Sequence, residues 1–102
     1  MLKTKPVRSE SYRRFVASHA CFACGIEGYS QCAHANGGGM GTKTSDLETF
    51  PLCCARIGDI GCHVRFDLCL YMTREERRWL TTQHVERMQD RARKAGRKEF
   101  AK

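Results

Sequence analysis

Seven cysteines are the residues of this 102-residue chain whose spacing points most directly to chemistry. Cys21 and Cys24 are separated by two residues, a spacing with which one tight turn brings two thiolates to the same metal ion. A structural zinc ion closes its shell with four nitrogen or sulfur ligands, so a second pair is required. Cys53 and Cys62 supply that pair, and Cys54 is an alternative to Cys53. We therefore predict one structural Zn²⁺ ion bound by Cys21, Cys24, Cys53 and Cys62.

The odd number of cysteines also argues against disulfide bonds, because one thiol would remain unpaired in any scheme. Disulfides do not persist in a reducing cytoplasm, where paired cysteines more often bind metal. The alternative for any of the four predicted zinc ligands is an ordinary buried thiol without metal. Cys32 and Cys69 are predicted to be packing residues. The sequence has no apolar run of the roughly 18 residues that a membrane span requires, and no apolar signal segment at its start. We expect a soluble, cytoplasmic protein with no membrane partner.

Two histidines and an aspartate offer a second kind of chemistry. His34 is predicted to end a strand before a glycine-rich loop, Asp46 to begin the next strand, and His63 to begin a helix directly after a proposed zinc ligand. A neutral imidazole near pH 7 can take a proton from water, and hard or borderline ligands can hold a cation against a phosphate. A histidine on a strand, a loop, a strand with a carboxylate and a helix with a second histidine form an arrangement that can hydrolyse phosphodiesters with a single divalent metal ion.

Short elements must position these residues, because 102 residues make one small domain and exclude the large α/β enzyme scaffolds. The predicted elements are a helix over 9–18, strands over 31–35 and 47–53, a helix over 61–70 and a helix over 74–95. Pro51 is expected to bend or end the second strand. The last helix begins with a capping box, Thr73 and Glu76, and ends at Gly96. The tail over 97–102 is expected to fray.

Charge divides the chain into three parts. Residues 1–18, a basic arm with a short helix, carry +4, residues 19–72, the zinc-bound core, carry −2, and residues 73–102, a basic helix and tail, carry +5. This distribution indicates a polyanionic partner for the two arms. The residues predicted to contact DNA phosphates are Lys43 after the glycine loop and the C-terminal cluster Arg91, Arg93, Lys94, Arg97 and Lys98. The alternatives are a flexible connection for the loop and a solvated helix face for the cluster.

Several of these motifs occur together in one known family. They are Cys21-Phe22-Ala23-Cys24-Gly25, Cys32-Ala33-His34-Ala35-Asn36, Gly38-Gly39-Met40-Gly41-Thr42-Lys43, Ser45-Asp46-Leu47 and Gly61-Cys62-His63. The set resembles the HNH (His-Me finger) endonucleases, and most of all their phage and prophage recombination-associated, Ref-like subgroup. The resemblance covers about residues 8–70.

The resemblance implies a ββα-metal core that cuts DNA. By position, His34 is the general base that activates water, Asp46 takes the place of the family's central asparagine, and His63 binds the catalytic cation, Mg²⁺ or Mn²⁺, together with Asp46. Many HNH enzymes carry an acidic metal ligand just before the base, where this chain has Ala33. The connection from Cys53 to Cys62 is also longer than in compact relatives.

The sequence therefore predicts an α+β fold: a small zinc-stabilised ββα-metal (HNH) core with an N-terminal helix and a long C-terminal helix. The predicted function is a metal-dependent HNH endonuclease that hydrolyses DNA phosphodiester bonds, of phage origin and located in the cytoplasm of a bacterial host. Its expected partners are DNA and a recombination protein. One alternative is a zinc-knuckle protein that binds nucleic acid without catalysis. Another is an interaction module of a recombination complex, in which the last helix docks a protein.

Overall fold

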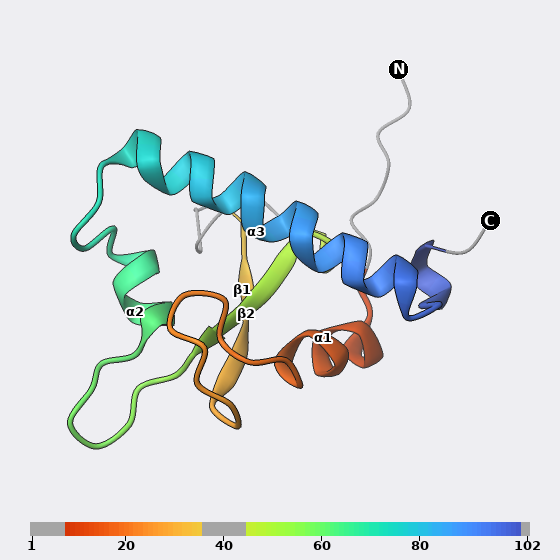
Figure 1. The fold of residues 1–102 in the computed structure, drawn as a ribbon, viewed down its shortest axis with the longest axis horizontal. Helices are drawn as coiled ribbons and strands as arrows, with labels where there is room; N and C mark the ends of the chain where they lie inside the picture. The colour runs from red at the N-terminus through yellow and green to blue at the C-terminus, as the bar shows by residue number, and fades with distance from the viewer. Residues whose placement is uncertain (1–7, 36–44, 101–102) are drawn as a thin grey trace.

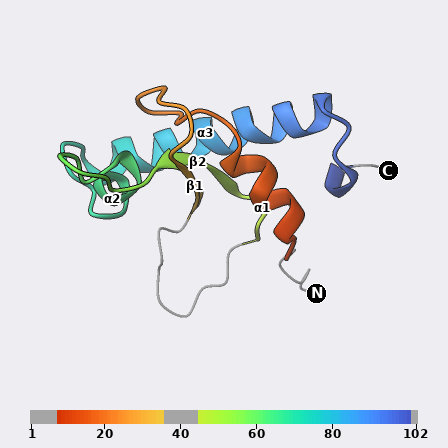
Figure 2. The same ribbon diagram turned by 90° about the horizontal axis from the view of Figure 1, so that it is seen from below.

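The computed structural model of the chain describes residues 8–35 and 45–100. Its elements are α1 (Glu10–Ala17), β1 (Ser30–His34), β2 (Thr49–Cys53), α2 (Cys62–Asp67), α3 (Arg74–Lys94) and a short 3-10 helix, η1 (Lys98–Phe100). The structure is a small α+β arrangement in which α3 lies across a two-stranded hairpin (Figure 1). Helix α2 lies at one end of α3, and α1 and η1 lie toward the other (Figure 2). None of the described helices is long and apolar enough to cross a membrane.

The sheet consists of β1 and β2 in antiparallel register, with Cys32 opposite Pro51 and His34 opposite Thr49. Pro51 does not end the second strand, which is one of the two predicted outcomes, because β2 continues through it to Cys53. A proline is tolerated here since β2 pairs with a strand on one side only. On the other side, the carbonyl of Pro51 accepts a hydrogen bond from the backbone N–H of Phe22 at 2.9 Å.

The core forms where α1, α2 and α3 pack against β2, all of whose residues are buried. The buried apolar residues outside the cysteines are Tyr12 and Val16 of α1, Ala33 of β1, Phe50 and Leu52 of β2, Phe66 of α2, and Met88 and Ala92 of α3. The rings of Phe50 and Phe66 meet edge to face, 5.4 Å apart. So few large apolar side chains stabilise a domain only modestly, which leaves room for a metal ion to contribute.

The predicted capping box is confirmed at the start of α3. The Thr73 hydroxyl accepts from the Glu76 N–H at 3.0 Å, and the Glu76 carboxylate accepts from the Thr73 N–H at 2.8 Å. Gly96, with φ of +73°, follows the end of the helix as predicted. Helix α1 begins in a similar way, because the Ser9 hydroxyl accepts from the N–H of Tyr12.

The expectation that residues 97–102 fray is wrong for residues 97–100. Phe100 packs its ring 5.8 Å from that of Tyr12. Arg97 donates to both oxygens of Glu99, at 3.0 and 2.9 Å, and Glu99 also accepts from the hydroxyl of Ser9 at 2.8 Å. An aromatic contact and a nearly buried ion pair therefore hold this segment against α1.

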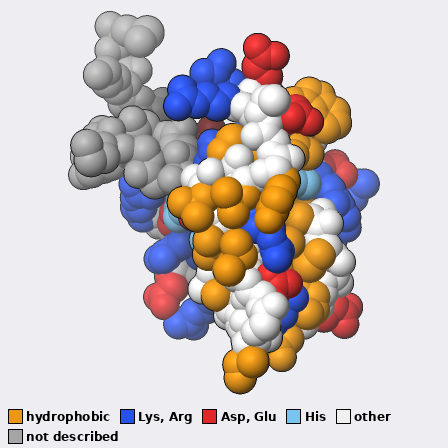
Figure 3. All heavy atoms as spheres, turned by 90° about the vertical axis from the view of Figure 1, so that its left-hand side faces the viewer, with side chains coloured by type: hydrophobic (Ala, Val, Ile, Leu, Met, Phe, Trp, Pro, Cys, Tyr) orange, Lys and Arg blue, Asp and Glu red, His pale blue; other side chains and the backbone are white. Residues whose placement is uncertain are grey.

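The end of the molecule at α2 carries much apolar surface, and Figure 3 shows hydrophobic side chains gathered there around a few charged groups. A cavity of about 220 Å³ lies between α2 and α3, lined by residues that include Phe66, Met72 and Leu80. In the loop between these helices, Cys69 and Tyr71 have φ values of 56° and 63°. This left-handed conformation cannot continue a helix, so α2 ends at Asp67 rather than at residue 70 as predicted.

Candidate functional site

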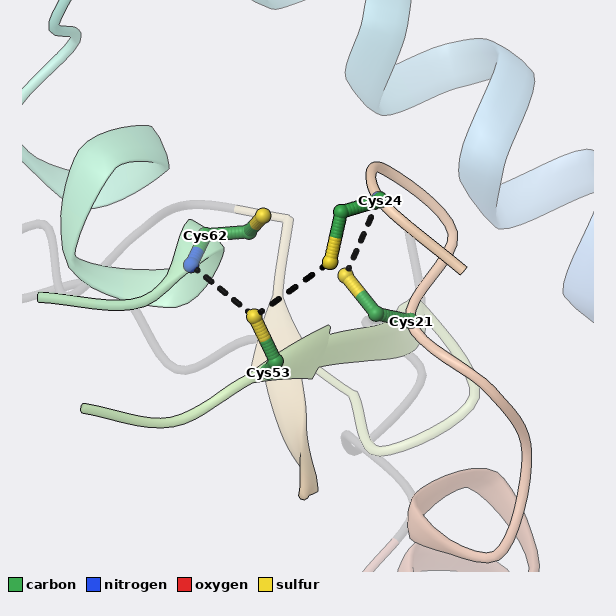
Figure 4. Close-up of side chains that lie close together, drawn as sticks. All are labelled: Cys21, Cys24, Cys53 and Cys62. Carbon is green, nitrogen blue, oxygen red and sulfur yellow. Dashed lines mark hydrogen bonds between the residues drawn. The ribbon is translucent and has the colours of Figure 1, made fainter. Parts of the chain in front are cut away.

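The thiols of Cys21, Cys24, Cys53 and Cys62 converge at one end of the hairpin, with all four sulfur atoms within 4.8 Å of one another (Figure 4). The first two come from the turn after α1, the third ends β2 and the fourth begins α2. Within residues 8–35 and 45–100, this is the one group of three or more His, Cys, Asp or Glu side chains able to share a metal ion. Four thiolates are a ligand set that zinc prefers, so the residues fit the predicted ion.

The structure also selects between the two alternatives for the third ligand. Cys53 points its sulfur at the cluster, 3.7 Å from that of Cys24, whereas the neighbouring Cys54 lies outside it. Successive side chains of a strand point to opposite faces, so only one of two adjacent cysteines can face the cluster. Cys32 packs against the core, as predicted.

Backbone N–H groups support the cluster from both sides. Those of Ala23 and Cys24 lie 3.4 and 3.5 Å from the sulfur of Cys21, and that of Cys62 lies 3.2 Å from the sulfur of Cys53. Such contacts favour the charged thiolate and orient a metal ligand. The turn that creates the first pair is closed by Gly25, whose φ is +80°.

The thiols of Cys53 and Cys62 differ in how easily they lose a proton. Burial raises the pKa of Cys53, but the N–H of Cys62, the Arg56 side chain and the neighbouring thiols outweigh burial and lower this pKa to about 7. Burial and the neighbouring thiols raise the pKa of Cys62. Cys53 is therefore the first of these two to ionise. A bound cation would favour the thiolate form throughout the cluster.

The long connection between Cys53 and Cys62 folds into a tight turn. Arg56 and Asp59 exchange two backbone hydrogen bonds of 2.9 Å, and the Asp59 carboxylate accepts from the N–H of Gly61, also at 2.9 Å. Gly61 has φ of +85°, and a Cβ atom there would lie 2.5 Å from the carbonyl carbon of Cys54. Only glycine fits this position, which places Cys62 opposite Cys53.

The second candidate site joins His34 and Asp46. His34 ends β1 with its side chain about one-third exposed, and its Nε2 lies 3.1 Å from Oδ1 of Asp46. Asp46 is only 2% exposed. The Ser9 N–H donates to its Oδ2 at 2.8 Å, Arg13 lies 3.2 Å from the same oxygen, and Arg8 lies 3.4 Å from Oδ1.

These contacts set the charge of Asp46. Burial alone would raise the pKa of its carboxyl, but the hydrogen bonds from His34 and Ser9 and the positive charge of Arg13 outweigh burial and hold the pKa below its usual value. Asp46 is therefore a carboxylate at neutral pH. An anionic acceptor at Nε2 favours the imidazole tautomer protonated on that nitrogen, which leaves Nδ1 of His34 as the basic atom.

His63 lies elsewhere. Its Nδ1 is 3.0 Å from the side-chain oxygen of Gln31, and its Nε2 is 3.4 Å from Asp67. Gln31 and His34 are three residues apart on β1, so their side chains point to opposite faces and their backbones are about 10 Å apart. Four donors already engage the oxygens of Asp46. The described residues therefore do not fit a divalent ion shared by Asp46 and His63.

The residues predicted to contact DNA differ in whether a carboxylate of the chain already pairs with them. Lys43 lies outside the described residues. Lys94 pairs with Asp90 at 3.0 Å and Arg97 with Glu99 at 2.9 Å, so carboxylates of the chain already meet both charges. Lys98 is exposed in η1.

Two further arginines of this set stack on aromatic rings. Arg93 lies over Phe100, 5.1 Å from the ring centroid, and Arg91 lies over Phe22 at 5.2 Å. A stacked guanidinium keeps its positive charge, because an aromatic ring is not a counterion.

Sequence reasoning missed the two arginines that flank Asp46, because they lie more than thirty residues from it along the chain. The positive charge of the first 18 residues indicated an anionic partner, but it did not indicate that two of these arginines lie beside Asp46. No protein-family model matches this chain, and no curated protein or solved structure matches it. A base held by a buried carboxylate, beside two guanidinium groups, can deprotonate water next to an anionic substrate.

Proposed function

We propose that this protein is a zinc-stabilised endonuclease of the HNH type that hydrolyses DNA phosphodiester bonds. The observation that carries the proposal is the pairing of His34 with buried Asp46, beside Arg8 and Arg13. The four-cysteine cluster supports the hairpin that bears His34, because Cys53 belongs to β2, the strand paired with β1. Phage origin and a recombination partner rest on the family resemblance alone.

In the proposed reaction, Nδ1 of His34 takes a proton from the attacking water molecule. Asp46 holds the opposite ring nitrogen, fixes the tautomer and stabilises the imidazolium that forms. Arrangements of this kind contribute roughly 10²–10⁴-fold to the rate of a hydrolysis. Asp46 is thus a positioning residue for the base.

Arg13 is the side chain best suited to hold the scissile phosphate. Its Nε contacts Asp46, its side chain is 46% exposed, and a guanidinium has five N–H donors, so donors remain for phosphate oxygens. Positive charge fixed at this point stabilises the negative charge that develops on phosphate during attack. The family resemblance adds a catalytic Mg²⁺ or Mn²⁺, but no step is assigned to that ion because the described residues do not fit it.

The test is an incubation of purified protein with supercoiled and single-stranded DNA, with and without Mg²⁺ or Mn²⁺. We expect wild-type protein to cleave and His34→Ala to lose at least about 100-fold in rate. DNA affinity and zinc content should stay unchanged. The control is His19→Ala, which removes an imidazole that hydrogen-bonds to the Phe15 carbonyl and packs on the Phe15 ring of α1, and should leave cleavage intact. Equal cleavage by His34→Ala and wild type would refute the assignment of the base.

A second candidate is a zinc-knuckle protein that binds nucleic acid without cutting it. One observation favours it: among the described residues, only the cysteines converge on a common metal position, and Ala33 stands where many HNH enzymes carry an acidic ligand. Binding of DNA by wild-type protein, with no cleavage under any of these ions, would support this second candidate.

A further inference from the structure

Phe22 lies between two ligands of the cysteine cluster and carries two positive charges over its ring. The guanidinium of Arg87 is 4.1 Å from the ring centroid and that of Arg91 is 5.2 Å from it. The backbone N–H of Phe22 donates to Pro51, so the turn that bears the ring is fixed to β2. The ring thus links the metal-supported turn to the middle of α3.

The two guanidinium groups are not neutralised within the described part of the chain. Arg87 and Arg91 are both exposed, stand four residues apart on α3 and form no ion pair with any described carboxylate. Like charges at this spacing repel each other and destabilise a helix. The charge of Arg87 also reaches His84, whose pKa is lowered by burial and then by this charge.

We propose that Arg87 and Arg91, stacked on Phe22, form a clamp for the phosphate groups of a nucleic-acid backbone. This inference rests on the proposed function, to which it adds the place where the strand is gripped. A planar guanidinium matches a phosphate with two parallel hydrogen bonds, and stacking on a ring reduces the side-chain freedom lost on binding. A phosphate would also relieve the repulsion between the two arginines.

A nucleic-acid strand fits this surface better than an acidic peptide does. The chain carries a net charge of +7, so an extended polyanion is attracted over a wide surface. The two groups over the ring of Phe22 are guanidinium groups, and contacts from such groups to phosphate carry no sequence information. We therefore expect binding that is insensitive to base sequence.

The experiment compares two double variants that remove the same charge from the same helix. Arg87→Gln with Arg91→Gln deletes the clamp, and Arg74→Gln with Arg78→Gln is the matched control, because these two arginines are also exposed and four residues apart on α3. Affinity for a short DNA duplex and for its single strand is measured by fluorescence anisotropy over a range of NaCl concentrations. Zinc content and thermal unfolding establish that each variant is folded.

For the clamp variant we expect about a tenfold loss of duplex affinity at physiological salt, and a slope of log affinity against log salt that is shallower by about 1.8. The control should change both quantities much less, since neither Arg74 nor Arg78 stacks on a described aromatic ring near the cysteine cluster. Phe22→Leu should weaken binding less than the clamp variant while leaving the salt slope near the wild-type value.

Wild-type affinity and slope in the clamp variant would overturn the inference, and so would an equal loss in the control. Cleavage is measured in parallel at saturating protein. Wild-type protein that binds through the clamp but does not cut would remove the proposed nuclease and leave this inference standing. Cleavage by wild-type protein, together with wild-type affinity in the clamp variant, would overturn this inference and leave the proposed nuclease standing.

Discussion

Ser9 connects two acidic residues that act in different places. Its backbone N–H donates to Asp46, and its hydroxyl donates to Glu99, whose side chain is only 4% exposed. Burial would raise the pKa of Glu99, but hydrogen bonds from Arg97 and Ser9 outweigh burial and hold this pKa below its usual value. Glu99 is therefore charged at neutral pH and joins the C-terminal segment to α1.

Replacing Glu99 by glutamine tests this link through pH. A carboxyl whose pKa is lower in the folded state contributes stability that is complete above its unfolded pKa, about 4.3, and is lost as pH falls through the folded pKa. We expect Glu99→Gln to lower the free energy of unfolding by about 1 kcal/mol at pH 7. The difference from wild type should shrink below about pH 4 in thermal unfolding series. A difference that stays constant over this range would contradict the assignment.

At the scale of elements, the turn between β2 and α2 decides whether the metal ligands meet. Gly58 and Gly61 both have φ of +85°, but only at Gly61 would a Cβ atom strike the backbone of residues 53 and 54. An alanine at either position would incur the same conformational cost for positive φ, but only at Gly61 would it lack space. Comparing the two substitutions therefore isolates the effect of the close approach.

We expect Gly58→Ala to cost about 1 kcal/mol of stability, and Gly61→Ala to cost at least about 3 kcal/mol because the backbone must also move. Since Gly61 precedes a ligand, its variant should also bind zinc more weakly. Denaturant unfolding and competition with a chromophoric chelator measure the two effects. Equal costs at both positions would show that the close approach to Cys54 does not matter.

Local signals in the sequence were enough to predict some elements and not others. The cap at Thr73, the glycine at 96 and the paired cysteines act within a few residues, and the structure confirms them. The continuation of β2 through Pro51 depends on which edge of the sheet is open, and the order of residues 97–100 depends on contact with α1. Only the folded chain decides either of these.

In the candidate site, too, the local contacts could be predicted from sequence and the long-range contacts could not. The convergence of Cys21, Cys24, Cys53 and Cys62 follows from spacing and from the ligand number of zinc. The joining of His34 to Asp46 and the separation of His63 depend on the face of β1 from which each contact is made. A strand of five residues with no clear alternation of polar and apolar side chains does not reveal its faces from sequence.

For the whole molecule, the cysteine cluster joins three segments that are distant in the sequence: the turn after α1, the end of β2 and the start of α2. Because the core is small, we expect much of the folding free energy to come from a zinc ion bound by this cluster. We expect one zinc ion per chain by elemental analysis, and loss of helical signal in far-ultraviolet circular dichroism after chelation. Re-addition of zinc should restore it. A folded preparation that contains no zinc would contradict this prediction.

The hydrogen bond between Ser9 and Glu99 spans 90 positions of the chain. Closing a loop of this length costs more chain entropy than forming a contact within one helix. We expect the anchor of Ser9, which also holds Asp46, to form after the helices themselves when the chain folds. The surroundings of His34 are therefore completed late in folding.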